Sequence, residues 1–267
     1  MPENAGDGER TRFEVDPAGV GTLTLANPRK LNAFDRKMIQ EIRALVSQVA
    51  SDDAVRALVI TGEGRGFCAG RDVEELRGKV DAPHLRTYVR ANHEMLDDLE
   101  QLEKPVIAAI NGVCAGGGVE LAASCDLRVA SDTATFLLPE LNLGVIPVSG
   151  ACSRLIQMIG IGRVKEMVLT GATYDATQVQ HWGLVNVVTR EAELAARAHR
   201  LAADCSRGAP EAVGLAKAVI NTCQDVDTAT GRRIERLALS RLVTNGDGTQ
   251  GLPAVPDGGS PALGDSA

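Results

Sequence analysis

Two glutamates in this 267-residue sequence stand in contexts that favour proton-transfer chemistry. Glu120 closely follows a glycine run at 116–118, and Glu140 lies in a leucine- and proline-rich stretch at 138–147. Their apolar neighbours indicate partly buried carboxyls, and burial raises the pKa of a carboxyl. Paired carboxyls of this kind can divide general-acid and general-base work near neutral pH. For either glutamate alone, a solvated surface position is the ordinary alternative.

Two glycine-lined segments could complete such a site with backbone N–H groups. Residues 66–72 read Gly-Phe-Cys-Ala-Gly-Arg-Asp, and the run at 116–118 opens a helix predicted to begin near Gly117. N–H groups at a helix start have no intrahelical acceptor, so they can stabilise a developing oxyanion. With the glutamates, these segments suggest acyl-thioester chemistry. Close helix packing or a tight turn would also explain a glycine triplet.

Other site classes find less support. The sequence has no P-loop, no GxGxxG opening a helix and no GxSxG nucleophile elbow. Its six cysteines lack a CxxC pair, so we expect no metal site and mostly core positions for them. A net charge of −7 with 3% aromatic residues disfavours nucleic-acid binding. An anionic ligand would instead need a local basic patch, and four residues beside the motifs could form one: Arg29, Lys30, Arg65 and Arg71.

The elements that must position these groups alternate between strands and helices, which predicts an α/β core. Short β-branched runs predict strands at 20–25, 57–61 and 106–110. Helical periodicity over 35–50, with Asp35 as a plausible N-cap, predicts a core-facing helix. After about residue 190 the pattern becomes helical only, over 192–205, 210–223 and 226–244.

This pattern divides the chain into four predicted parts. We expect a flexible N-terminus at 1–11, a core with the active site at 12–190, a helical assembly region at 191–245 and a disordered tail at 246–267. No apolar run reaches the roughly 20 residues of a membrane helix, and the start lacks a signal-peptide pattern. We therefore expect a cytoplasmic protein without a membrane partner.

Several ordered motifs make the sequence resemble the enoyl-CoA hydratase/isomerase family, or crotonase superfamily. The resemblance covers roughly residues 12–245. The matching segments lie at 27–33, 66–72, 104–112, 115–120, 125–128, 139–144, 167–171 and 182–185. The resemblance implies a spiral of repeated strand-strand-helix turns, a helical C-terminal subdomain and assembly as a homotrimer or homohexamer.

The resemblance also implies residue roles for an enoyl-CoA hydratase of fatty acid and lipid metabolism, with no metal or redox cofactor beyond the coenzyme A of its substrate. Backbone N–H groups of Ala69 and Gly117 would hold the thioester oxygen. Glu120 would deprotonate the water, and Glu140 would protonate the α-carbon. The acyl-CoA would contact residues of both glycine-lined turns and of the 30–33 segment: Lys30, Ala33, Ala69, Gly70, Arg71, Asp72 and Gly117.

Two departures leave the reaction open. The family's glycine-rich stretch after Pro147 is here Val-Ser-Gly-Ala-Cys, which adds side chains beside the implied acyl pocket. The chain also has no lysine after Lys217, where the family often has a lysine-containing segment over the CoA. The alternatives are therefore another crotonase-type reaction, such as isomerisation, specialised dehydration or C–C hydrolysis, and, more remotely, a non-catalytic scaffold.

Overall fold

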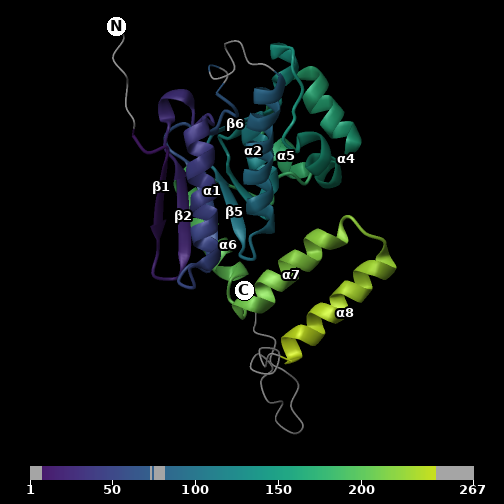
Figure 1. Cartoon of the computed structure of the whole chain (residues 1–267). Coiled ribbons are helices and arrows are strands. Elements are labelled where there is room, and N and C mark those ends of the chain that lie inside the picture. Colours follow the sequence, from purple (N-terminus) through teal and green to yellow (C-terminus); the bar gives the residue numbers. More distant parts are fainter. Residues whose placement is uncertain (1–7, 73, 75–81, 245–267) are drawn as a thin grey trace.

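The computed structural model describes residues 8–72, 74 and 82–244 (Figure 1). Within these residues, the strands form a six-stranded and a four-stranded sheet. The large sheet has the order β1 (Thr11–Val15), β2 (Val20–Leu25), β3 (Ala57–Gly62), β5 (Val106–Ile110), β7 (Leu127–Ser131) and β10 (Val187–Thr189). The small sheet has the order β4 (Gly66–Cys68), β6 (Val113–Ala115), β8 (Thr135–Leu137) and β9 (Tyr174–Asp175).

Successive strands alternate between the two sheets, which produces a spiral. Each of β3, β5 and β7 lies in the large sheet, and each is followed by a strand of the small sheet, β4, β6 and β8 respectively. The helices α2 (Ala82–Gln101) and α3 (Gly117–Ser124) return the chain after the first two of these pairs. Neighbouring core strands within each sheet are parallel, as such crossovers require. The predicted spiral of strand-strand-helix turns is confirmed.

Helix α1 (Arg36–Ser51) packs one apolar face on the core, beside α2 in Figure 1. Its N-terminus is capped because the Asp35 side chain accepts a hydrogen bond from Met38 N, so the predicted cap is confirmed. The buried face carries Met38, Ile39, Ile42, Leu45, Val46 and Val49. Three of the cysteines, Cys68, Cys114 and Cys125, are fully buried core residues, whereas Cys152 is exposed.

The C-terminal helices form where the sequence predicted them: α6 (Leu194–Cys205), α7 (Pro210–Cys223) and α8 (Thr228–Thr244). Helix α6 packs Leu194, Ala198 and Ala202 on the outer face of the large sheet. It therefore belongs to the core, and only α7 and α8 extend away from it as a pair (Figure 1). Leu237 and Leu239 of α8 are 66% and 63% exposed.

Arg10, at the inner end of the N-terminal segment predicted to be flexible, contacts the start of α1. Arg10 N donates to Glu41 of α1, and the Arg10 side chain pairs with Asp35 at 2.6 Å, so the chain is held before β1 begins at Thr11. Residues 1–7 and the predicted tail at 246–267 lie outside the described residues. Across the described ranges, no helix combines the length and apolar character needed to cross a bilayer.

Candidate active site

The two glycine-lined turns face each other. Gly70 has a φ of +89°, and a Cβ at this position would lie 2.8 Å from the backbone nitrogen of Gly117. A Cβ at Gly117 would in turn lie 3.6 Å from the nitrogen of Arg71. Only glycine at position 70 permits both the backbone angle and this close approach. The N–H groups of Arg71 and Gly117 therefore lie near one another.

These two N–H groups are available to a ligand. In the part of the chain that the structure describes, neither the Arg71 nor the Gly117 backbone nitrogen donates to a protein acceptor. Gly117 is the first residue of α3, so its N–H also has the positive end of the helix dipole behind it. The pair has the arrangement of an oxyanion hole.

The Ala69 prediction needs a correction. Its backbone N–H donates to the carbonyl of Leu31 at 2.9 Å, so it is already engaged. Leu31 and Asn32 both have left-handed backbone angles, and the buried Asn32 side chain bonds to the Gly66 carbonyl at 2.7 Å. This turn brings the Leu31 carbonyl to Ala69. The free donor in the segment is two residues further on, at Arg71.

Glu120 occupies the first turn of α3 and is only 2% exposed, as the sequence predicted. Its Oε1 accepts hydrogen bonds from the backbone nitrogens of Ser149 at 2.6 Å and Ala151 at 3.3 Å. Ala151 begins α4 (Ala151–Thr170), so the carboxylate lies at the N-terminal end of that helix. Backbone donors at such an end stabilise a negative charge.

Glu140 opens the short 3₁₀ helix η3 (Glu140–Leu143) and reaches back toward the start of α3. A Cβ at Gly116 would lie 2.7 Å from Glu140 Oε1, and within the described residues the buried Oε2 has no hydrogen-bond partner. Burial raises the pKa of Glu140 to about 7, and the negative charge of Glu120 raises it further. A hydrogen bond from the Glu140 backbone N–H and the positive charge of Arg71 both act to lower this pKa. The two glutamates thus sit in contrasting environments, which is how acid and base roles are divided.

The predicted CoA-contacting segment is close to the same turns. Lys30 binds Asp72 and Glu74, both at 2.6 Å, and these carboxylates raise its pKa. Ala33 is buried, and the backbone of neighbouring Phe34 pairs with Gly70 and Asp72. The structure therefore joins the 30–33 segment to the 69–72 turn, although the Lys30 charge is already compensated.

Arg71 points its side chain toward α2 and α4. Its guanidinium donates to Ser149 Oγ at 2.7 Å and lies over the Tyr88 ring, 5.4 Å from the centroid. Burial lowers the pKa of Arg71, while the charges of Glu120, Tyr88 and Glu140 raise it. The predicted basic patch is thus divided, because Arg29 and Arg65 remain exposed on the surface.

The sequence analysis missed Ser149 and Asn92, which are buried and joined by a hydrogen bond of 2.7 Å. Serine in place of the expected glycine after Pro147 was the available signal. Asn92 lies on α2 among buried positions such as Tyr88 and Met95. A polar residue on an apolar helix face was therefore the second available signal.

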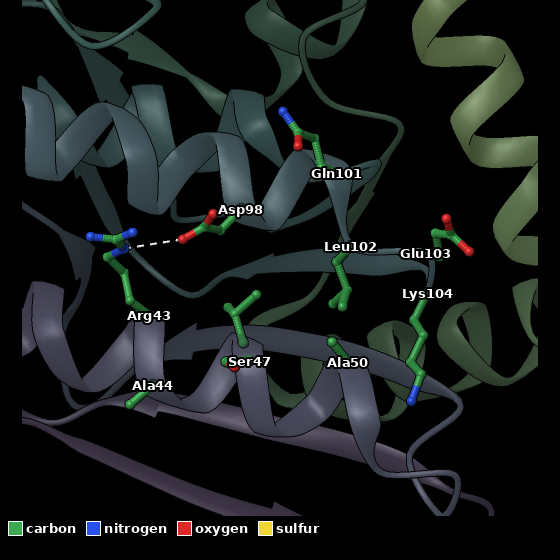
Figure 2. A pocket seen from close by; sticks show the side chains of 10 residues that line it. Arg43, Ala44, Ser47, Ala50, Asp98, Gln101, Leu102, Glu103 and Lys104 are labelled. Atoms are coloured by element: carbon green, nitrogen blue, oxygen red, sulfur yellow. Dashed lines mark hydrogen bonds and ion pairs between the residues drawn. The ribbon is translucent and has the colours of Figure 1, made fainter.

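Two hollows lie apart from the two glutamates and the glycine-lined turns. One, of 660 Å³, lies between α1 and α2. In Figure 2, Arg43 and Asp98 form an ion pair at one end of it and Lys104 lies at the far end. A larger groove of 1390 Å³ separates α7 from the core, and Ser149 reaches its wall. None of the residues predicted to act on substrate lines either hollow.

A strand-strand-helix spiral that carries two facing glycine turns is a crotonase-type fold. The chain belongs to the enoyl-CoA hydratase/isomerase family, whose model matches residues 16–255. The crystal structure of an enoyl-CoA hydratase from Bacillus anthracis superimposes with a TM-score of 0.84 at 33% identity, covering 88% of this chain and 91% of that one.

Two further relatives show the range of named activities. A short-chain-enoyl-CoA hydratase of Clostridium acetobutylicum is 34% identical over 236 residues, covering 88% of this chain and 90% of that protein. A mevalonyl-coenzyme A hydratase of Aspergillus fumigatus is 37% identical over 199 residues, covering 72% and 70% respectively.

Proposed function

We propose that this protein is an enoyl-CoA hydratase that adds water reversibly across the 2,3 double bond of a 2-enoyl-CoA thioester. The observation that carries the proposal is the pairing of two unlike carboxyls. Glu120 is held by backbone N–H groups, and Glu140 is a half-buried carboxyl with a pKa of about 7. Membership of the hydratase/isomerase family supports the same substrate class.

The first step is activation of the thioester. Its carbonyl oxygen accepts hydrogen bonds from the N–H groups of Arg71 and Gly117, which draws electron density from the double bond and makes C3 electrophilic. Negative charge accumulates on that oxygen as the enolate forms, so these donors bind the transition state more tightly than the substrate. Loss of one such donor typically costs about 3 kcal/mol of transition-state stabilisation.

The second step is the addition itself. Glu120 accepts a proton from water as the water oxygen bonds to C3. The protonated Glu140 then gives its proton to C2 as the enolate collapses. Glu120 afterwards releases the proton that it took from water and Glu140 regains one, so one water is added overall and both carboxyls are restored. The reverse sequence dehydrates a 3-hydroxyacyl thioester. Only protons and water move, so this reaction calls for no metal or redox cofactor.

Binding of the CoA portion is assigned to the segment from Lys30 to Ala33 and to the turn from Gly70 to Asp72. Both segments border the proposed oxyanion hole through the pairing of Phe34 with the turn. Lys30 could approach a phosphate only while sharing its charge with Asp72 and Glu74. We therefore expect backbone groups to contribute more to CoA binding than this lysine.

The test is loss of the conjugated-thioester absorbance when crotonyl-CoA is added to purified protein. Glu120→Gln and Glu140→Gln should each lower kcat by about 100-fold or more, since each removes a proton-transfer group. Glu191→Gln, at an exposed position in the 3₁₀ helix η4 (Glu191–Glu193), is the matched control. Butyryl-CoA binding to all variants separates loss of chemistry from loss of the site.

The second candidate is another crotonase-type reaction: isomerisation, dehydration of an unusual hydroxyacyl group or C–C hydrolysis. The polar Ser149 and Arg71 side chains beside Glu120 favour it, because they suit a functionalised acyl group better than a plain alkyl chain. Butyryl-CoA binding without crotonyl-CoA turnover would select this candidate. A scaffold without catalysis would require that both glutamine variants leave every cellular phenotype unchanged.

Assembly as a homotrimer or homohexamer is part of the proposal. It is supported by exposed apolar side chains on α8 and on the segment that runs from the end of η3 to α4, where Leu143, Val145 and Ile146 are 61%, 52% and 62% exposed. Light scattering coupled to size-exclusion chromatography gives the number of subunits. Leu237→Glu should lower that number if α8 forms a subunit interface. We also place the protein in the cytoplasm, which cell fractionation tests.

A further inference from the structure

Ser149 joins the Glu120 carboxylate to groups from three other parts of the chain. Its backbone N–H donates to Glu120 Oε1 at 2.6 Å. Its Oγ accepts hydrogen bonds from Asn92 Nδ2 and Arg71 Nη2, both at 2.7 Å. Its carbonyl accepts one from Arg154 at 3.2 Å. The residue is 1% exposed, so water cannot readily replace these partners.

Helix α2 anchors this residue from two positions. Asn92, which is fully buried, holds the hydroxyl directly. Arg154 holds the carbonyl and is itself bound to Asp97 at 2.6 Å and Glu100 at 2.7 Å on the same helix. The first turn of α4 is thus fixed against α2 by the side chain and the main chain of Ser149.

Glu120 depends on this turn for its orientation. Across the described residues, its carboxylate accepts hydrogen bonds only from Ser149 N and Ala151 N, which lie two residues apart. A shift of the turn would carry the carboxylate with it. A displacement of about 1 Å in a reacting group can cost about 100-fold in rate.

The amide orientation of Asn92 does not affect this link. As assigned, Nδ2 donates to Ser149 and the buried Oδ1 has no partner within the described residues. With the amide turned over, Oδ1 would accept the Ser149 hydroxyl proton instead. Either orientation keeps the hydrogen bond that ties α2 to the start of α4.

We propose that Ser149 is a positioning residue whose hydroxyl locks the start of α4 onto Asn92 and Arg71 and so fixes the Glu120 carboxylate. The inference rests on the proposed function for its catalytic consequence. Ser149→Ala keeps the N–H that binds Glu120 but leaves the buried Asn92 amide and the half-buried Arg71 guanidinium without this acceptor. The loss should therefore appear in the chemical step rather than in substrate binding.

Steady-state hydration of crotonyl-CoA tests this assignment. Ser149→Ala should lower kcat about 10- to 100-fold while KM changes less than about threefold, since the thioester-binding N–H groups remain in place. Ser153→Ala, an exposed serine one turn along α4, is the matched control and should leave both constants unchanged. Equal kcat in wild type and a folded Ser149→Ala would overturn the proposal.

A double-mutant cycle distinguishes loss of the hydrogen bond between Asn92 and Ser149 from a general disturbance of the fold. Asn92→Ala should also lower kcat, and the double variant should lose no more than Ser149→Ala alone, because both single variants remove the same Asn92–Ser149 hydrogen bond. Additive losses would contradict the lock. Circular dichroism and thermal melts confirm that each variant is folded.

A third readout is independent of turnover. In protein labelled with carboxyl-¹³C glutamate, the Glu120 signal, assigned with Glu120→Gln, should shift in Ser149→Ala and stay in place in Ser153→Ala. An unmoved signal overturns the proposal even if the wild type hydrates no enoyl-CoA. Absent hydration with a shifted signal would instead reject the proposed function and keep Ser149 as the residue that orients Glu120.

Discussion

Glu140 packs directly against the backbone of Gly116, the residue that caps α3. A Cβ at position 116 would lie 2.7 Å from Glu140 Oε1, which is closer than real Cβ contacts allow. Gly116 also accepts a hydrogen bond from Glu120 N at 3.2 Å. One small residue thus fixes the distance between the proposed acid and the helix that carries the proposed base.

Gly116→Ala should therefore lower both catalysis and stability. The added methyl group displaces the Glu140 carboxyl, and we expect kcat for crotonyl-CoA to fall about 100-fold. The φ of +50° adds backbone strain of about 1–3 kcal/mol, so the melting temperature should also fall. Kinetics and a thermal melt measure the two effects.

Gly162→Ala supplies the control for that substitution. This residue lies within α4, and a Cβ there meets nothing within 4 Å. Alanine should stabilise the helix by about 0.5–1 kcal/mol and leave kcat unchanged. If Gly116→Ala behaved like Gly162→Ala, the contact between Gly116 and Glu140 would have no catalytic consequence.

The pH dependence of hydration should follow Glu140. Because burial raises its pKa to about 7, the carboxyl is largely protonated below that pH and can give its proton to C2. Hydration kcat should fall as the pH rises above about 7. Glu140→Gln should remove most of the activity and, with it, this pH dependence. Dehydration needs the same single proton, then carried by Glu120 for the leaving hydroxide, so it should fall over the same range. Initial rates in both directions measure this, and a dehydration rate that rose with pH would contradict the assignment.

The same group should also make stability depend on pH. Its folded-state pKa lies above the ordinary glutamate value of 4.5, so the folded protein binds this proton more tightly than the unfolded chain. The favourable contribution is fully present below about pH 4.5 and is lost as the pH rises through about 7. Glu140→Gln should therefore gain stability relative to wild type as the pH rises over this window, by on the order of 1–2 kcal/mol after allowance for partial exposure. Urea denaturation of both proteins across the window measures the difference, and a constant difference would argue against a buried Glu140.

Local patterns predicted the elements well because their causes are local. The Asp35 cap, the apolar face of α1 and the glycine start of α3 all act within a few residues, and all three form as expected. The alternation of strands and helices indicated the α/β class. The spiral itself required the resemblance, since spacing alone does not say which sheet each short strand joins.

The site could be predicted only in part because its hydrogen bonds connect distant segments. Which N–H in the 66–72 turn is free depends on the Leu31 carbonyl, which takes the Ala69 donor. Nothing in the turn itself shows this. Likewise, the proximity of Lys30 to Asp72 follows from the fold, so a charge that looked available for phosphate proves to be paired.

The attachment of α7 to the core gives a last prediction. Lys217 is 9% exposed at its side chain and binds Asp126 at 2.9 Å, with further hydrogen bonds to the carbonyls of Leu99 and Lys104. Burial raises the pKa of Asp126, whereas Lys217 lowers it. Lys217→Met would leave this carboxylate buried without its cation, which typically costs about 3–5 kcal/mol.

Urea denaturation should show that loss for Lys217→Met, and adding Asp126→Asn should recover much of it because the uncompensated charge disappears. The exposed pair of Arg241 and Glu211, which joins α8 to α7 at 2.8 Å, is the comparison. Arg241→Met should cost less than about 1 kcal/mol, since solvent screens exposed pairs. Equal losses at the two pairs would mean that burial does not strengthen the attachment of α7. A large loss at Lys217 alone would identify this ion pair as the main polar anchor of the C-terminal helices.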